Sequence, residues 1–122
     1  MDFEKLNGLK RTHKCGEITK NDIGSEVVVM GFTNSVRNLG ALNFINVRDI
    51  SGIVQTVFST DNAEMYEKAS KVRGEYVLAV KGVVKAREEA AVNKDMATGE
   101  IEIEATELRI LSSAKTPPFY IV

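Results

Sequence analysis

The sequence lacks several residues on which common kinds of site depend: it has no tryptophan, one cysteine, one histidine and two prolines. Cys15 cannot form an internal disulfide, so a reducing compartment is expected and a structural role for this thiol. Zinc normally takes four protein ligands, or three and an open position, and His13 with Cys15 falls short of both. A nucleophile with a histidine base and a glycine-rich phosphate loop are also missing. We therefore expect no catalytic residues, no metal site and no cofactor in this chain.

Long hydrophobic runs and an excess of basic charge are missing as well. No apolar run approaches the roughly 20 residues that span a bilayer, and residues 1–10 do not resemble a signal peptide, so we expect a cytoplasmic protein without a membrane partner. The 16 basic and 17 acidic side chains argue against non-specific coating of nucleic acid, which requires many neutralised phosphates. Recognition of a few exposed bases stays open, and it would depend on one or two particular aromatic rings.

Five β-rich segments and one helical segment follow one another along the chain. β-Branched and alternating residues predict strands at 26–33 and on towards Arg37, at 42–49, 53–58, 76–87 and 100–111. Helix formers at 63–72, preceded by a capping box of Asp61 and Glu64, predict one short helix, and 19–22 predicts a single helical turn. The polar residues 88–98 predict a surface loop.

Three strands, a helix and two further strands, joined by glycine-containing turns, predict an all-β fold with one short helix: a five-stranded Greek-key OB-fold barrel. The motif Thr116-Pro117-Pro118 favours an extended connector over a continued sheet. We therefore predict an N-terminal extension at residues 1–10, the barrel at 11–111, and a linker at 112–122 to a domain that is absent.

Phe44 is the most informative residue, because it is out of phase with the core pair Ile45 and Val47. It shares its strand face with Asn46 and Arg48, and in an OB-fold this face is the usual oligonucleotide surface. An exposed ring there stacks a base for about 1 to 3 kcal/mol. The alternative is that curvature of the barrel buries Phe44, and periodicity leaves both interpretations open.

Gln55 interrupts an apolar strand and should emerge on the face of Phe44. Its amide could read a base edge, or it could be a polar residue on a solvated strand face. Arg37 could stack or bind phosphate, or it could be solvated. The acidic stripe that includes Glu102 and Glu104 fits a solvated face too, although a carboxylate also accepts hydrogen bonds from guanine.

A family resemblance emerges from a series of motifs in a fixed order. They are Arg11-Thr12-His13, Cys15-Gly16-Glu17, residues 37–40, FINVRDISGIVQTVF at 44–58, residues 83–87, Asn93, DMATGEIEI at 95–103 and AKTPPF at 114–119. Together they resemble the N-terminal domain of bacterial-type aspartyl-tRNA synthetases, from Arg11 to about Phe119. Individual pieces are weak, but their order and spacing are highly specific.

This resemblance implies recognition of the aspartate anticodon of tRNA, with bases G, U and C. It implies that Phe44 stacks on the central uracil, that Arg37 and Gln55 contact it, that Glu102 reads the guanine, and that Arg87 lies near the anticodon loop. It further implies a parent aspartate-tRNA ligase with a class II catalytic domain, which uses ATP and Mg²⁺ and is a homodimer. None of the catalytic residues is expected in this chain.

Two departures from the family pattern bear on affinity. The family usually has a run of arginines where this chain has Ser35 and Val36, and often a tryptophan at Phe32, so weaker backbone binding is expected. A rival hypothesis is a free-standing OB-fold that binds single-stranded nucleic acid or a protein. A nearer rival is the matching domain of an asparaginyl- or lysyl-tRNA synthetase, against which the segments 95–103 and 114–119 count.

Overall fold

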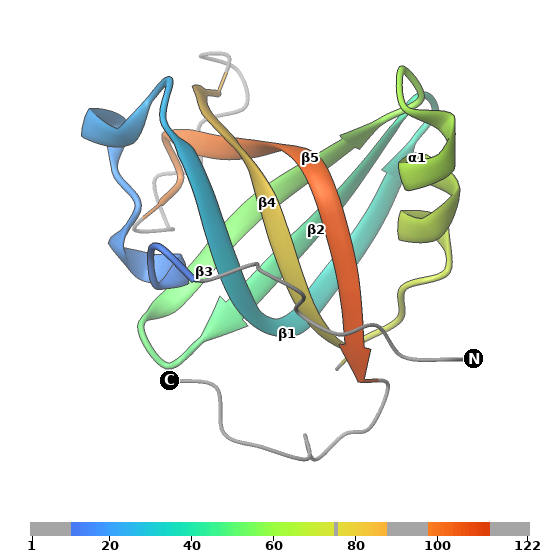
Figure 1. The fold of residues 1–122 in the computed structure, drawn as a ribbon, viewed down its shortest axis with the longest axis horizontal. Coiled ribbons are helices and arrows are strands. Elements are labelled where there is room, and N and C mark those ends of the chain that lie inside the picture. Colours follow the sequence, from blue (N-terminus) through green and yellow to red (C-terminus); the bar gives the residue numbers. More distant parts are fainter. Residues whose placement is uncertain (1–10, 75, 88–97, 113–122) are drawn as a thin grey trace.

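A computed structural model describes residues 11–74, 76–87 and 98–112. Within this part of the chain five strands close into a barrel in the order β1-β2-β3-β5-β4 (Figure 1). They are β1 (Glu26–Leu39), β2 (Leu42–Asp49), β3 (Gly52–Ser59), β4 (Val77–Ala86) and β5 (Ile101–Ser112). Helix α1 (Ala63–Ser70) joins β3 to β4, and only the pairing of β3 with β5 is parallel. The predicted OB-fold barrel with one short helix is confirmed.

Three predicted segments fall wholly or mostly outside the described residues: the N-terminal extension, the loop that ends at Thr98, and the linker. Thr98 itself is buried, and its hydroxyl donates a hydrogen bond to the carbonyl oxygen of Ile53. Ser112, where the linker was expected to begin, still belongs to β5.

Strand β1 pairs with two neighbouring strands because it bends midway. It pairs with β4 from Glu26 to Phe32 and with β2 from Phe32 to Leu39, with a register shift between Thr33 and Ser35. A Cβ added at Gly31 would collide with the carbonyl of Arg48, so only glycine allows this close approach. Bulges and glycines of this kind turn barrel corners. The bend extends β1 to Leu39 and thereby puts Arg37 beside β2.

The barrel interior is filled by alternate residues of every strand. Ile45 and Val47 are fully buried, which confirms the predicted core pair of β2, and Val54 of β3 is buried beside them. The tight connection between these strands needs the positive φ of Gly52, 146°, which costs glycine least. Because side chains alternate, the residues between these core positions must face outwards, and that outer surface carries the candidate site.

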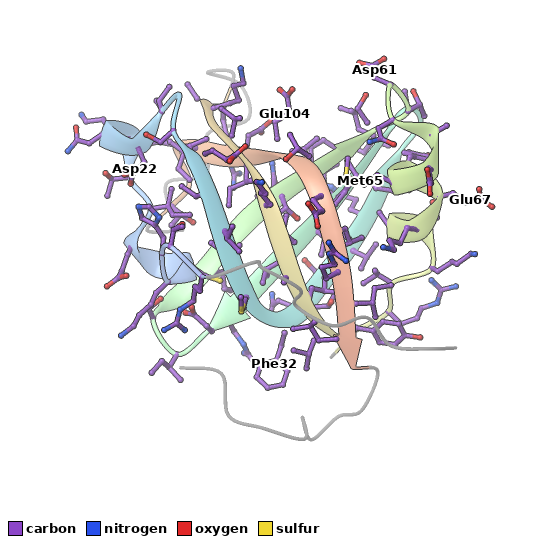
Figure 2. The ribbon with its side chains drawn as sticks, viewed as in Figure 1. Asp22, Phe32, Asp61, Met65, Glu67 and Glu104 are labelled. Atoms are coloured by element: carbon purple, nitrogen blue, oxygen red, sulfur yellow. The ribbon has the colours of Figure 1, made fainter. Side chains whose placement is uncertain are left out.

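Helix α1 covers one opening of the barrel. Met65 points from it towards the strands and is buried, whereas Glu67 points away (Figure 2). The predicted capping residue was wrong by one position: the side chain of Asn62, not Asp61, accepts a hydrogen bond from the Met65 backbone amide at 3.1 Å. Asp and Asn cap helices equally well, so propensity could not separate two adjacent candidates.

Two 3₁₀ turns precede β1 and lie on the side of the barrel away from α1 (Figure 1). η2 (Lys20–Asp22) confirms the predicted helical turn, whereas η1 (Cys15–Glu17) was not predicted. Cys15 is fully buried in η1, and its backbone amide donates to Asp49 Oδ2 at 2.8 Å. Burial raises the pKa of the Cys15 thiol, and the negative charge of Asp49 adds to the shift. The thiol therefore stays protonated and unreactive, as expected of a structural residue.

Candidate nucleic-acid interface

The outward residues of four strands line up in two parallel rows. In the first row Arg37 of β1 pairs with Phe44 of β2, Phe44 with Val57 of β3, and Val57 with Glu104 of β5. The second row lies two residues further along each strand, a distance of about 7 Å. This second row is polar, and the two rows together form what we call the outer face.

Phe44 sits in the middle of the first row as a half-buried ring. It lies beside Val57, which is 6% exposed, so part of the ring covers a neighbour and part meets solvent. The guanidinium carbon of Arg37 lies 5.3 Å from the ring centroid, a cation–π contact. Since Arg37 is exposed, this contact is worth about 0.5 to 1 kcal/mol, little enough for a base to replace the guanidinium over the ring.

The second row is a chain of hydrogen-bonding side chains. Asn46 Nδ2 donates to Ser35 Oγ at 3.1 Å, Asn46 pairs with Gln55 across the β2–β3 ladder, and Gln55 Nε2 donates to Glu102 Oε1 at 3.2 Å. Gln55 lies on the face of Phe44, as predicted, but it is only 6% exposed and so is not a solvated surface residue. Its amide is held by Glu102 rather than free to rotate.

Arg87, the residue directly after β4, also belongs to the site. It is 9% exposed, and its Nε donates to the carbonyl oxygen of Ile101 at 3.0 Å. Burial lowers the pKa of the Arg87 guanidinium; the negative charge of Glu102 opposes this shift, and the positive charge of Arg37 adds to it. An arginine stays protonated even so. Arg87 therefore lies close enough to Glu102 and to Arg37 to interact with each of them.

The structure thus brings together all five residues that the sequence singled out: Arg37, Phe44, Gln55, Arg87 and Glu102. Glu104 differs from Glu102, because it is exposed and lies between Val57 of β3 and Val83 of β4. Sequence reasoning missed Asn46 and Ser35 as members of the polar row. The sequence analysis had placed Asn46 on the face of Phe44, and its alternation with Val47 was the one sequence feature that could have marked it as a site residue.

A hollow of about 530 Å³ lies away from the outer face, between α1 and β5. Acidic and basic side chains, Glu64, Glu67, Lys68 and Lys71, line it without an aromatic ring, so it offers no platform for a base. Among residues 11–74, 76–87 and 98–112 there is no group of three or more His, Cys, Asp or Glu side chains that could hold a metal ion. Nor does this part of the chain contain a helix long and apolar enough to cross a membrane.

An aromatic ring, two amides and paired charges on the outer face of an OB barrel are suited to single-stranded nucleic acid. A family model described as an OB-fold nucleic acid binding domain, of the tRNA anticodon type, matches residues 27–111. The chain belongs to this family. The match begins one residue into β1 and ends one residue before the end of β5, so it covers all five strands of this anticodon-type OB-fold domain except Glu26 and Ser112.

Sequence comparison with curated proteins places the chain more closely within this family. The OB-fold domain is 57% identical over 118 residues to the aspartate–tRNA ligase of Ruminiclostridium cellulolyticum, covering 97% of this chain and 20% of that protein. It is 54% identical over 119 residues, with the same coverage, to the aspartate–tRNA(Asp/Asn) ligase of Thermoanaerobacter pseudethanolicus. The chain spans about a fifth of the length of these curated relatives and is homologous to their N-terminal region.

One solved structure supports the same fold. The aspartyl tRNA synthetase from Entamoeba histolytica superposes with a TM-score of 0.79 at 22% identity, covering 96% of this chain and 25% of that one. At this identity the likeness concerns the fold alone.

Proposed function

We propose that this chain recognises the anticodon of aspartate tRNA, as the anticodon-binding domain of an aspartate–tRNA ligase. The observation that carries the proposal is the convergence of Arg37, Phe44, Gln55, Arg87 and Glu102 on one outer face. These residues come from positions up to 65 apart, 102 minus 37; the family resemblance had pointed to all five, and the residue pattern to all but Arg87. Convergence on an interior or on opposite faces would have argued against a shared ligand.

Each side chain has chemistry that suits one part of an anticodon. The Phe44 ring stacks on the central uracil, and Arg37, once displaced from that ring, reaches the same nucleotide. Gln55 offers a donor and an acceptor to the uracil edge. Glu102 accepts from the imino and amino groups of guanine, the first base. Arg87, whose guanidinium interacts with the charge of Glu102, supplies positive charge to the loop backbone.

The remaining four fifths of the parent protein would carry the ligase chemistry. We assign to it the binding of ATP, Mg²⁺ and aspartate, the charging of the tRNA and the homodimer contact, all in the cytoplasm. The relatives named above are ligases, and this chain matches a fifth of each. The chain by itself binds tRNA and catalyses no step.

Binding by the chain alone should be weak and selective. With a net charge of −1 and few basic residues on the outer face, it neutralises few phosphates, so affinity falls with salt along a shallow slope. Selectivity comes instead from stacking and hydrogen bonds, which salt affects little. A protein that coats single strands would show the opposite balance.

The test is a competition titration of the chain against two RNA stem-loops that share one stem. One loop carries the anticodon GUC, and the other carries the same nucleotides in scrambled order. We expect the GUC loop to bind more tightly at low and at moderate salt. Equal binding of the two loops would refute the anticodon function and would favour a generic single-strand binder.

A further inference from the structure

The polar row of the outer face contains one buried acceptor that has no partner. Among the described residues, Asn46 Oδ1 is the side-chain oxygen or nitrogen that is buried without a hydrogen bond. Its own amide nitrogen is engaged, since Nδ2 donates to Ser35 Oγ at 3.1 Å. A buried acceptor that no protein group satisfies is costly unless a water or a ligand donates to it, and such an atom in a native protein calls for an explanation.

The position of Asn46 in the row suggests what satisfies this oxygen. The row runs from Glu102 on β5 through Gln55 on β3 to Asn46 on β2 and Ser35 on β1. In the proposed function Glu102 meets the first anticodon base, and Gln55 meets the second. A strand laid across the face in that direction brings its third base to Asn46. The residue as a whole is half-buried, so its amide lies close beneath the surface of the row.

We infer that Asn46 is a specificity-determining residue that reads the third anticodon base and favours cytosine over uracil. This inference rests on the proposed function and adds the choice at one base to it. Cytosine presents an exocyclic amino group, a donor that Oδ1 accepts. Uracil presents a carbonyl oxygen at the same position, which would face Oδ1 as acceptor against acceptor. Cytosine at this base separates the aspartate anticodon GUC from the asparagine anticodon GUU.

Ser35 sets the size of this preference. While its hydroxyl accepts from Nδ2, the amide keeps Oδ1 for the ligand. A hydroxyl can also donate, so the amide can turn over and present Nδ2 to uracil, at the cost of reorienting the Ser35 hydroxyl. The preference for cytosine should therefore be modest, about tenfold, the worth of one hydrogen bond.

The experiment measures the affinity of the chain for two stem-loops that differ only in GUC against GUU. The wild-type chain should prefer GUC about tenfold. Asn46→Ala removes the acceptor and should bring the ratio close to one, mainly by weakening GUC binding. Asn46→Asp offers only acceptors, so it should keep or widen the ratio even though its charge weakens binding to both loops.

A matched control is Asn21→Ala, the same substitution at an exposed residue of η2, which should leave the ratio and both affinities unchanged. Thermal melting of each variant shows that the barrel is folded. A ratio that survives Asn46→Ala overturns the role of Asn46, while the anticodon function still stands if GUC binds better than the scrambled loop. A wild-type chain that binds GUC and GUU equally also overturns it. Failure against the scrambled loop overturns both proposals.

Discussion

Removal of the Phe44 ring is the sharpest single test of the outer face. In Phe44→Ala a base loses a stacking surface worth about 1 to 3 kcal/mol. Part of that is offset, because in the wild-type chain the base must first displace the Arg37 guanidinium, a contact worth about 0.5 to 1 kcal/mol. The net loss should be about 1 to 2 kcal/mol, or roughly a 5- to 30-fold weaker affinity for the GUC stem-loop. Fluorescence or calorimetric titration measures it.

The same substitution also tests the structure, because Phe44 is half-buried beside Val57. We expect it to cost about 1 to 2 kcal/mol of unfolding free energy, less than the 3 to 5 kcal/mol of a fully buried phenylalanine. Two variants separate stacking from packing. Phe44→Leu keeps an apolar cover over Val57 but has no π face, so it should lose binding while it keeps most stability.

Met30→Ala removes a buried side chain from the separate cluster that also contains Val28, so it should lose stability and keep binding. Wild-type affinity in Phe44→Leu would refute the stacking argument. Loss of binding in Met30→Ala comparable with that in Phe44→Ala would show that binding merely follows stability.

Three further predictions address other residues. Glu102→Ala should reduce the preference for guanine at the first anticodon base, measured with GUC and AUC loops, whereas Glu104→Ala should hardly change it. The reason is that Glu102 accepts a hydrogen bond from Gln55, while Glu104 is exposed. Equal effects of the two substitutions would mean that the acidic stripe acts only through its charge. Partial burial of Asp49 opposes ionisation, but hydrogen bonds from the Ser51 side chain and the Cys15 and Ser51 amides outweigh it and lower its pKa below 3.8. Its stabilising contribution should therefore be complete above about pH 4 and be lost as pH falls through the lowered pKa, and urea unfolding at pH 6 and pH 3 should show a smaller acid loss in Asp49→Asn. Asn62→Ala should lower the unfolding free energy by about 1 kcal/mol and Asp61→Ala by much less, and the reverse order would restore the capping box.

The fold was predictable from the sequence because local patterns agree with the barrel. Alternation along residues 42–49 put Ile45 and Val47 inside and Phe44 outside, and the structure has the same facing. The tight turn before β3 then fixed the register, which placed Gln55 on the face of Phe44. Phe44 is half-buried, which lies between the two alternatives of an exposed ring and a ring buried by the curvature of the barrel. Its exposure depends on Val57 and Arg37, which belong to other strands.

What the sequence could not give are contacts between distant residues. Gln55 is buried and donates to Glu102, 47 positions away, across a parallel strand pair that no short-range pattern predicts. Arg87 is likewise buried, and two of its partners, the carbonyl of Ile101 and the charge of Glu102, lie 14 and 15 positions away on β5. Asn46 looked like any polar residue on a strand, and its unsatisfied oxygen emerges only when all its neighbours are in place.

The near-neutral charge of the chain is consistent with a selective reader rather than at odds with it. On the outer face the positive charge of Arg87 is balanced by Glu102, so the pair adds little to long-range attraction. What remains is short-range: one ring and a row of amide and carboxylate groups whose partners fix their orientation. A wrong base leaves such groups buried and unpaired, which costs more than a right base gains. Discrimination can therefore be strong where affinity is low, and Ser35, which is uncharged, orients an amide instead of adding charge.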